Sequence, residues 1–180
     1  MKIEIKNRFT GAVIFAYEKE NNTIKDTVEE AIRLNVSLEF AYLENFDFRN
    51  CNFRYADFKN CNFKYADFEY SNLESANLTA IKADFFEILS KAPTEIGGLK
   101  QALINGNING CAYEGDCCCL VGTIANVRGC NYTELDGILP NGSRPAERWF
   151  FGIKVGDTPK NSPIAKITLD WINEYETLIN

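Results

Sequence analysis

A five-residue repeat occupies the middle of this 180-residue sequence and constrains its fold more than any other feature. Nine consecutive units span residues 36–80, and mostly small residues stand two positions before each unit's centre. A period of five fits neither the roughly 3.6-residue turn of a helix nor the two-residue alternation of a strand, so the chain must turn at short, regular intervals. The repeat therefore predicts a solenoid. The central residues are Leu38, Leu43, Phe48, Phe53, Phe58, Phe63, Phe68, Leu73 and Leu78.

Three of the units read Ala-Asp-Phe or Ala-Asn-Leu, at residues 56–58, 66–68 and 76–78. These units resemble the pentapeptide-repeat family. The resemblance implies a right-handed quadrilateral β-helix with four repeats in each coil. It also implies that the central residue and the small residue two positions before it point inward, while the Asp, Asn or Ser between them points outward.

The charges of the repeats support this stacking. Residues 20 apart are expected in adjacent coils, separated by the roughly 4.8 Å spacing of paired strands. A spacing of 15 would instead place Arg49 beside Lys64, a destabilising contact between like charges. Cys51 and Cys61 occupy the small-residue positions that the resemblance implies point inward, so we expect buried thiols there. The opposite-charge pairs at a spacing of 20 are Glu39 with Lys59, Glu44 with Lys64, Arg49 with Glu69, and Arg54 with Glu74.

Composition indicates a globular protein of one or two domains, with 46% hydrophobic and 24% charged residues. We expect no membrane span and no signal peptide, because no apolar stretch is long enough and the first residues are charged. Seven cysteines without a secretion signal predict a reducing, cytoplasmic location, the host cytoplasm if a phage encodes the chain. The net charge of −6 disfavours direct binding to nucleic acid and favours a basic partner.

The sequence contains no histidine, which removes the commonest general base and every Ser-His or Cys-His pair. We therefore expect a non-enzymatic protein without a cofactor. Cys111, Cys117, Cys118, Cys119 and Cys130 are candidate zinc ligands, but three successive cysteines cannot easily face one metal, so no metal site is predicted. A nucleophilic role for Cys117 or Cys119 is an alternative, and buried, unreactive thiols are the favoured interpretation.

The expected fold class is α+β. Residues 1–35 are predicted to form a β-hairpin and a helix, capped by Thr23 or Thr27, that cover the first coil. Residues 36–80 are the β-helix of about two coils, and residues 81–180 a mainly helical domain. Helices are expected at residues 83–92, 94–105, 118–127 and 146–153, and from Ser162 and Pro163 onward.

The C-terminal segments 113–126 and 143–148 resemble the tails of pentapeptide-repeat proteins carried by bacteriophages and prophages. One group of residues there is a candidate ligand site, because Arg forks match phosphate and aromatic rings stack on bases. The residues are Arg144, Arg148, Trp149 and Lys154. The alternative is a helix with Trp149 packed inward and its cations in solvent.

Two hypotheses of function follow. The first is an interaction protein of phage or prophage origin that binds and inhibits a host protein, such as a nucleic-acid-binding or defence protein. An acidic face formed by Asp47, Asp57 and Asp67 would bind it by partial DNA mimicry. Two and a quarter coils rise only about 10 Å, so the mimicry is limited unless a homo-oligomer lengthens it. The second is a homo-oligomeric sponge that sequesters a nucleotide-like small molecule in the C-terminal domain.

Overall fold

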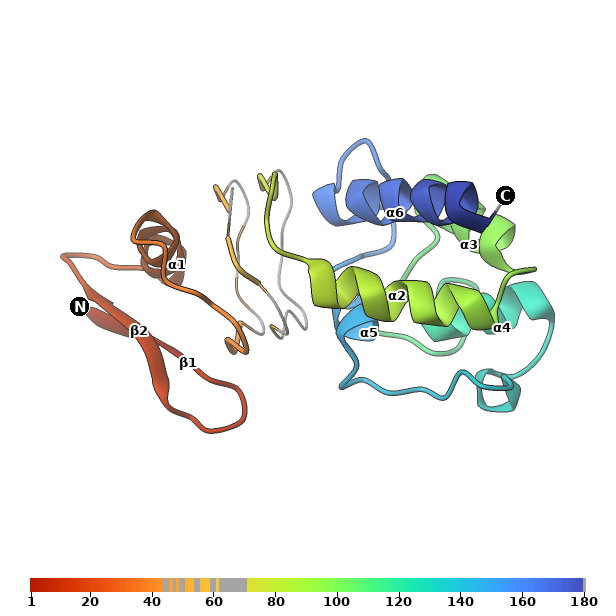
Figure 1. Ribbon diagram of the computed structural model, residues 1–180, viewed down its shortest axis with the longest axis horizontal. Helices are drawn as coiled ribbons and strands as arrows, with labels where there is room; N and C mark the ends of the chain where they lie inside the picture. The colour runs from red at the N-terminus through yellow and green to blue at the C-terminus, as the bar shows by residue number, and fades with distance from the viewer. Residues whose placement is uncertain are drawn as a thin grey trace.

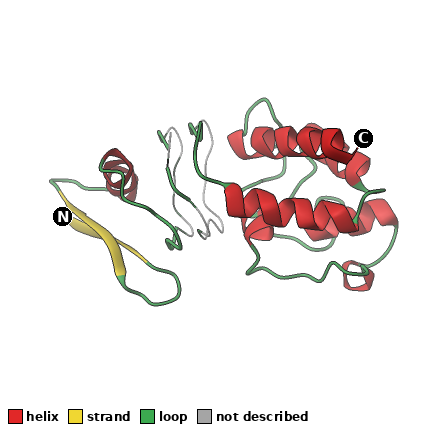
Figure 2. Ribbon diagram, in the orientation of Figure 1, coloured by secondary structure: helices red, strands yellow, loops and turns green. Residues whose placement is uncertain are grey.

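The computed structural model describes residues 1–43, 46, 48, 51–53, 56–58, 61 and 71–179. The chain runs from a β-hairpin at one end, through the repeats, to a group of helices at the other end (Figure 1). Colouring by secondary structure places the strands in the N-terminal part and most helices in the C-terminal part (Figure 2). This mixed content agrees with the predicted α+β class.

The N-terminal hairpin consists of β1 (Lys2–Lys6) and β2 (Val13–Glu18), paired antiparallel with an irregularity between Ile5 and Lys6. It contacts the start of the repeats through an antiparallel bridge between Asn7 and Ala41. Ile5 is 1% exposed and belongs to the same apolar core as the first repeats. The predicted hairpin is thus confirmed, with its second strand shifted toward the C-terminus.

Helix α1 (Ile24–Arg33) follows the hairpin and begins at Thr23, one of the two predicted caps. The Thr23 hydroxyl accepts a hydrogen bond from the Asp26 amide, and the Asp26 carboxylate accepts one from the Thr23 amide. This reciprocal capping box satisfies two amide groups that a helix start otherwise leaves without partners. Val28 and Ala31 of α1 are fully buried, so the helix covers the core at this end of the molecule.

Among the described repeat residues, Asn52 pairs with Asn72 and Asp57 with Asn77 in parallel bridges. The Phe53 amide donates to the Asn72 carbonyl at 2.8 Å, and the Asn77 amide to the Ala56 carbonyl at 2.7 Å. Each bridge joins positions 20 residues apart, a spacing also seen between the side chains of Asp57 and Asn77. The predicted spacing of 20 is therefore confirmed at these positions.

Aromatic side chains fill the interior of the repeats. Phe48, Phe53 and Phe58 are fully buried, and successive rings lie 5.2 Å apart in edge-to-face geometry. Such contacts stabilise beyond the area that they bury. Every opposite-charge pair predicted at a spacing of 20 has at least one member outside the described residues.

Six helices lie in the described part of the chain, and five of them follow the repeats. The first of these, α2, begins at Thr79 rather than at the predicted residue 83, because the Lys82 amide already bonds to the Leu78 carbonyl. Helix α4 begins two residues later than predicted, because Cys118 forms a parallel bridge with Ile108. The five helices are α2 (Thr79–Lys91), α3 (Ile96–Asn105), α4 (Leu120–Arg128), α5 (Pro145–Phe150) and α6 (Pro163–Ile179), with a short 3-10 helix at Tyr132–Glu134.

Helices α2, α5 and α6 meet in an aromatic core. Trp149 of α5 and Trp171 of α6 have ring centroids 5.3 Å apart, and Phe85 of α2 lies 5.7 Å from Phe150. Helix α6 begins at Ser162 and Pro163 as predicted, and the Ser162 hydroxyl accepts the Ala165 amide. None of the helices in the described ranges is both long and apolar enough to cross a membrane.

Candidate functional site

Asp57 lies in a column of polar side chains on the repeats. The Ser37 hydroxyl donates to Asp57 Oδ2 at 2.7 Å, and Asn77 Nδ2 donates to Asp57 Oδ1 at 3.0 Å. The donors come from the residues 20 before and 20 after Asp57, so the carboxylate is held from both sides. This confirms the predicted stacking of Asp57 with Asn77. Asp47 and Asp67, which were predicted to share the acidic face, lie outside the described residues.

The column reaches the molecular surface beside α1. Ser37 and Asn77 are exposed, and Asp57 is half-buried. A depression of about 160 Å³ adjoins the carboxylate, between the end of α1 and the repeats. The Ser37 hydroxyl and the Asn77 amide are both neutral donors. The depression is lined by Ile32, Asn35, Val36, Ser37, Ala56 and Asp57.

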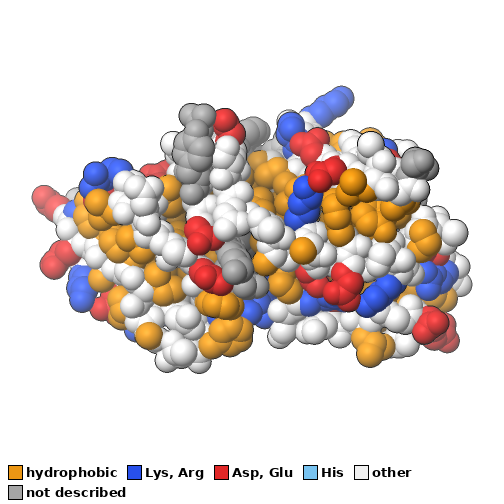
Figure 3. All heavy atoms as spheres, viewed as in Figure 1, with side chains coloured by type: hydrophobic (Ala, Val, Ile, Leu, Met, Phe, Trp, Pro, Cys, Tyr) orange, Lys and Arg blue, Asp and Glu red, His pale blue; other side chains and the backbone are white. Residues whose placement is uncertain are grey.

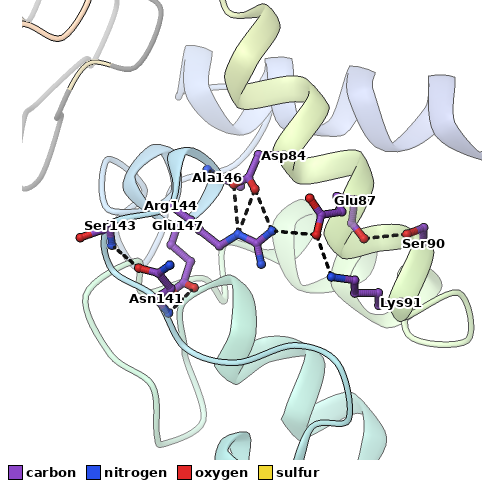
Figure 4. Close-up of polar contacts among 9 residues, drawn as sticks. All are labelled: Asp84, Glu87, Ser90, Lys91, Asn141, Ser143, Arg144, Ala146 and Glu147. Atoms are coloured by element: carbon purple, nitrogen blue, oxygen red, sulfur yellow. Dashed lines mark hydrogen bonds and ion pairs between the residues drawn. The ribbon is translucent and has the colours of Figure 1, made fainter.

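Arg144, one of the predicted ligand residues, is engaged by acidic side chains of α2 (Figure 4). Arg144 Nη2 lies 2.7 Å from Asp84 Oδ1, and Arg144 Nε donates to both carboxylate oxygens of Asp84. The second oxygen of Asp84 also accepts the Ala146 amide at 2.8 Å, and Glu87 lies 3.6 Å from Arg144 Nη2. Only 14% of each side chain of the Arg144 and Asp84 pair is exposed. The pair therefore joins α2 to the start of α5.

Glu147 lies next to this pair and is fully buried. The Tyr113 hydroxyl donates to Glu147 Oε2, and the Asn141 amide donates to Oε1 at 2.8 Å. Burial raises the pKa of the Glu147 carboxyl, and these two donors and Arg144 oppose that shift. Burial, and then the contact with Glu147, raises the pKa of Tyr113. The arrangement links the loop before α4 to α5 through buried polar groups.

The other predicted ligand residues lie in different surroundings. Arg148 is only 7% exposed, and its Nη1 finds no hydrogen-bond partner in the described structure. Trp149 is 1% exposed and donates from its indole nitrogen to Thr168 at 2.8 Å. Lys154 is exposed in the loop after α5. The alternative prediction that Trp149 packs inward is confirmed. Its second part, that the cations lie in solvent, is wrong for Arg144 and Arg148, which are largely buried.

The cysteines are mostly buried. Cys51 and Cys61 are each 2% exposed inside the repeats, as predicted, and the Cys61 thiol donates to the Leu38 carbonyl at 2.9 Å. Burial raises the pKa of Cys119 to about 12, which disfavours a reactive thiolate. Cys111 is exposed, so the buried interpretation is wrong there. The residues that the structure describes contain no group of three metal-ligating side chains.

The sequence analysis did not identify Asp84, which binds Arg144, or Tyr113, which binds Glu147. The only local signal for Asp84 is an acidic residue directly before two Phe residues in a helical segment. The pairing of Arg128 with Glu95 was also not predicted. In the structure Glu95 is 5% exposed and accepts a hydrogen bond from Arg128 Nε at 2.8 Å. Two acidic side chains in this part of the chain are thus paired with arginines, Asp84 with Arg144 and Glu95 with Arg128.

Comparison with known proteins gave one positive finding. No curated protein and no solved structure matches the chain. The family model of pentapeptide repeats matches residues 41–79 in eight copies. The first predicted unit, residues 36–40, lies outside the match, although the Leu38 amide bonds to the Asp57 carbonyl at 3.1 Å as a stacked repeat would. Residues 41–79 are therefore a segment of pentapeptide repeats.

Proposed function

We propose that the chain is a non-enzymatic interaction protein that binds and inhibits a basic protein partner through the polar column of its repeats. The observation that carries this proposal is the Asp57 carboxylate held between Ser37 and Asn77. A carboxylate held by hydrogen bonds from both sides is ordered before a partner arrives. Less side-chain freedom is then lost on binding.

In the proposal, the acidic face of the repeats includes more than the column of Asp57. A right-handed quadrilateral β-helix would place Asp47 and Asp67 in a second column of the same acidic face. Complementary charge contributes mainly to the rate and specificity of association, so such a face would select partners with exposed Lys and Arg. A nucleic-acid-binding or defence protein of the host of a phage or prophage is a partner of that kind.

Partial DNA mimicry belongs to the same proposal. A repeat segment of about two coils rises about 10 Å, whereas duplex DNA carries one charge for about every 1.7 Å of its axis. The face would therefore contact one small basic site. A homo-oligomer that joined repeat segments would lengthen it.

The contacts of Arg144 favour this proposal over a nucleotide sponge in the C-terminal domain. Its guanidinium is engaged by Asp84 and approached by Glu87, so a phosphate would have to compete with two carboxylates. Trp149 is 1% exposed and offers no accessible face for a base to stack on.

Affinity capture from host lysate at low salt tests the proposal when wild type is compared with Asp57→Asn. The variant keeps a side-chain oxygen for the Ser37 hydroxyl but removes the charge. Asp170→Asn on α6 is the control, because it removes one exposed acidic charge far along the chain. We expect a basic partner that wild type and the control retain and Asp57→Asn loses. Equal capture by all three proteins, or no partner at low salt, contradicts the proposal.

A further inference from the structure

A cavity of about 360 Å³ lies where the last coil of the repeats meets α2 and α6. The N-terminal ends of both helices face that coil (Figure 1). Figure 3 shows hydrophobic side chains gathered where the repeats meet the C-terminal helices, with acidic and basic side chains beside them. The volume falls in the range of small-molecule sites, about 300 to 1,000 Å³. The lining residues are Leu73, Ala76, Leu78, Thr79, Lys82, Ile167 and Trp171.

The wall formed by α6 is apolar and rigid. Ile167 and Trp171 are four residues apart and therefore share one face of that helix. The Trp171 ring packs against Trp149 at 5.3 Å and Phe85 at 6.2 Å, which fixes its position. Leu73 and Leu78 of the repeats form the apolar wall of the last coil. These side chains suit the apolar body of a ligand.

Trp171 also carries a hydrogen-bond donor without a partner. The residue is 8% exposed, yet its indole nitrogen donates to no described residue, whereas that of Trp149 donates to Thr168. Unlike Arg148 Nη1, this nitrogen is not fully buried, so solvent or a ligand can reach it. The cavity that Trp171 lines is the place where a ligand acceptor would reach this residue.

The start of α2 adds further donors. Asn77 Oδ1 accepts from the Thr79 amide at 3.3 Å, but the amides of Ala80 and Ile81 donate no hydrogen bond to the described residues. Leu78 and Thr79, at the same helix start, line the cavity. Free amides and the helix dipole favour an anion at such a position.

Lys82 provides a positive charge at the cavity. Its ammonium lies 2.6 Å from each carboxylate oxygen of Glu174 on α6. The two side chains are 31% and 49% exposed, so this pair lies at the mouth of the cavity rather than in the core. A ligand carboxylate would compete with Glu174 for the same ammonium.

We propose that this cavity binds a small apolar monocarboxylate, such as an aromatic acid. Its hydrocarbon body would lie against Leu73, Leu78, Ile167 and Trp171. Its carboxylate would accept from Lys82 and from the amides of Ala80 and Ile81 at the start of α2. This site is separate from the Asp57 column, so either proposal can fail without the other.

Isothermal titration calorimetry on the full chain tests the proposal, with 4-phenylbutyrate and its neutral amide as the two probes. We expect the acid to bind more tightly than the amide. Lys82→Gln should lower the affinity for the acid about tenfold or more, since a hydrogen bond to a charged group contributes about 1.5 to 3 kcal/mol. Glu174→Gln frees the ammonium and should strengthen acid binding, while the affinity for the amide stays the same.

Two further variants guard against indirect effects. Ile167→Trp fills the cavity and should abolish binding of both probes, with circular dichroism and thermal melting verifying that the variant is folded. Lys166→Gln is the matched control, because Lys166 forms a similar ion pair with Asp170 on the outside of α6. The affinity of Lys166→Gln for the acid should equal that of wild type. Equal affinities for acid and amide, binding that survives Ile167→Trp in a folded protein, or weaker acid binding by Glu174→Gln would each overturn the proposal.

Discussion

Asp84→Ala should destabilise the C-terminal helices far more than the loss of an exposed carboxylate would. Asp84 accepts from Arg144 Nε and Nη2 and from the Ala146 amide. Its replacement leaves a guanidinium that is 14% exposed and a helix amide without their main acceptor. Removing one partner of a buried ion pair costs about 3 to 5 kcal/mol. Glu87 remains 3.6 Å from Arg144, so we expect about 3 kcal/mol, the lower end of that range.

Urea denaturation followed by tryptophan fluorescence measures this loss. Both tryptophans of the chain, Trp149 and Trp171, lie in α5 and α6, so their signal reports on the helices that the pair joins. The matched control is Asp170→Ala, which breaks an exposed pair with Lys166 and should change the free energy of unfolding by at most about 0.5 kcal/mol.

A double-mutant cycle isolates the pair itself. Arg144→Met removes the cation and leaves Asp84 bonded to the Ala146 amide, so its cost should be smaller than that of Asp84→Ala. Because both changes break the same contact, the double variant should lose less stability than the sum of the two, by about 1 kcal/mol or more. Additive effects, or a cost for Asp84→Ala no larger than that of Asp170→Ala, would refute the reasoning.

Four further substitutions test other residues of the chain. Phe53→Ala should cost about 3 to 5 kcal/mol in the free energy of unfolding, because the ring is fully buried between two other Phe rings of the repeats, and urea denaturation measures it. Gly110→Ala should greatly lower the melting temperature, because a Cβ there would lie 1.7 Å from the Phe150 carbonyl oxygen. Gly97→Ala in α3, with nothing within 4 Å, should instead stabilise by up to about 1 kcal/mol. Finally, burial raises the pKa of Glu147 above 4.5, so wild type should lose stability relative to Glu147→Gln as pH rises from 4.5 through that raised pKa. A stability difference that stays constant over this pH range would contradict the assignment.

The repeat segment was predictable because its information is local and periodic. The spacing of Phe48, Phe53 and Phe58 indicated the buried positions, and each of these rings is fully buried. The 20-residue stacking was implied by the family resemblance and supported by the charges, and it is seen directly at Asp57 and Asn77. The start of α2 was missed because its first turn, from Thr79, overlaps the last repeat in sequence.

The contacts around Arg144 and Glu147 were less predictable because they join segments that are distant in the sequence. Arg144 and Asp84 are 60 residues apart, and neither composition nor periodicity indicates that they pair. Arg148 was expected to be exposed because arginines mostly are, and its 7% exposure reflects packing that no local pattern encodes. The sequence allowed Trp149 to be either a ligand residue or a core residue, and its 1% exposure and its bond to Thr168 place it in the core.

The 20-residue coil also governs how the length of this protein can change. The hairpin and α1 end one side of the stack, and α2 continues directly from the other side. Inserting four repeats would move the two ends apart by about 4.8 Å and keep their mutual orientation. Inserting a single repeat would instead turn one end against the other by about a quarter of a revolution, since four units complete a coil. The stack thus sets the angle between the two ends in discrete steps, and a lineage that altered its repeat number would change which surfaces face the same side.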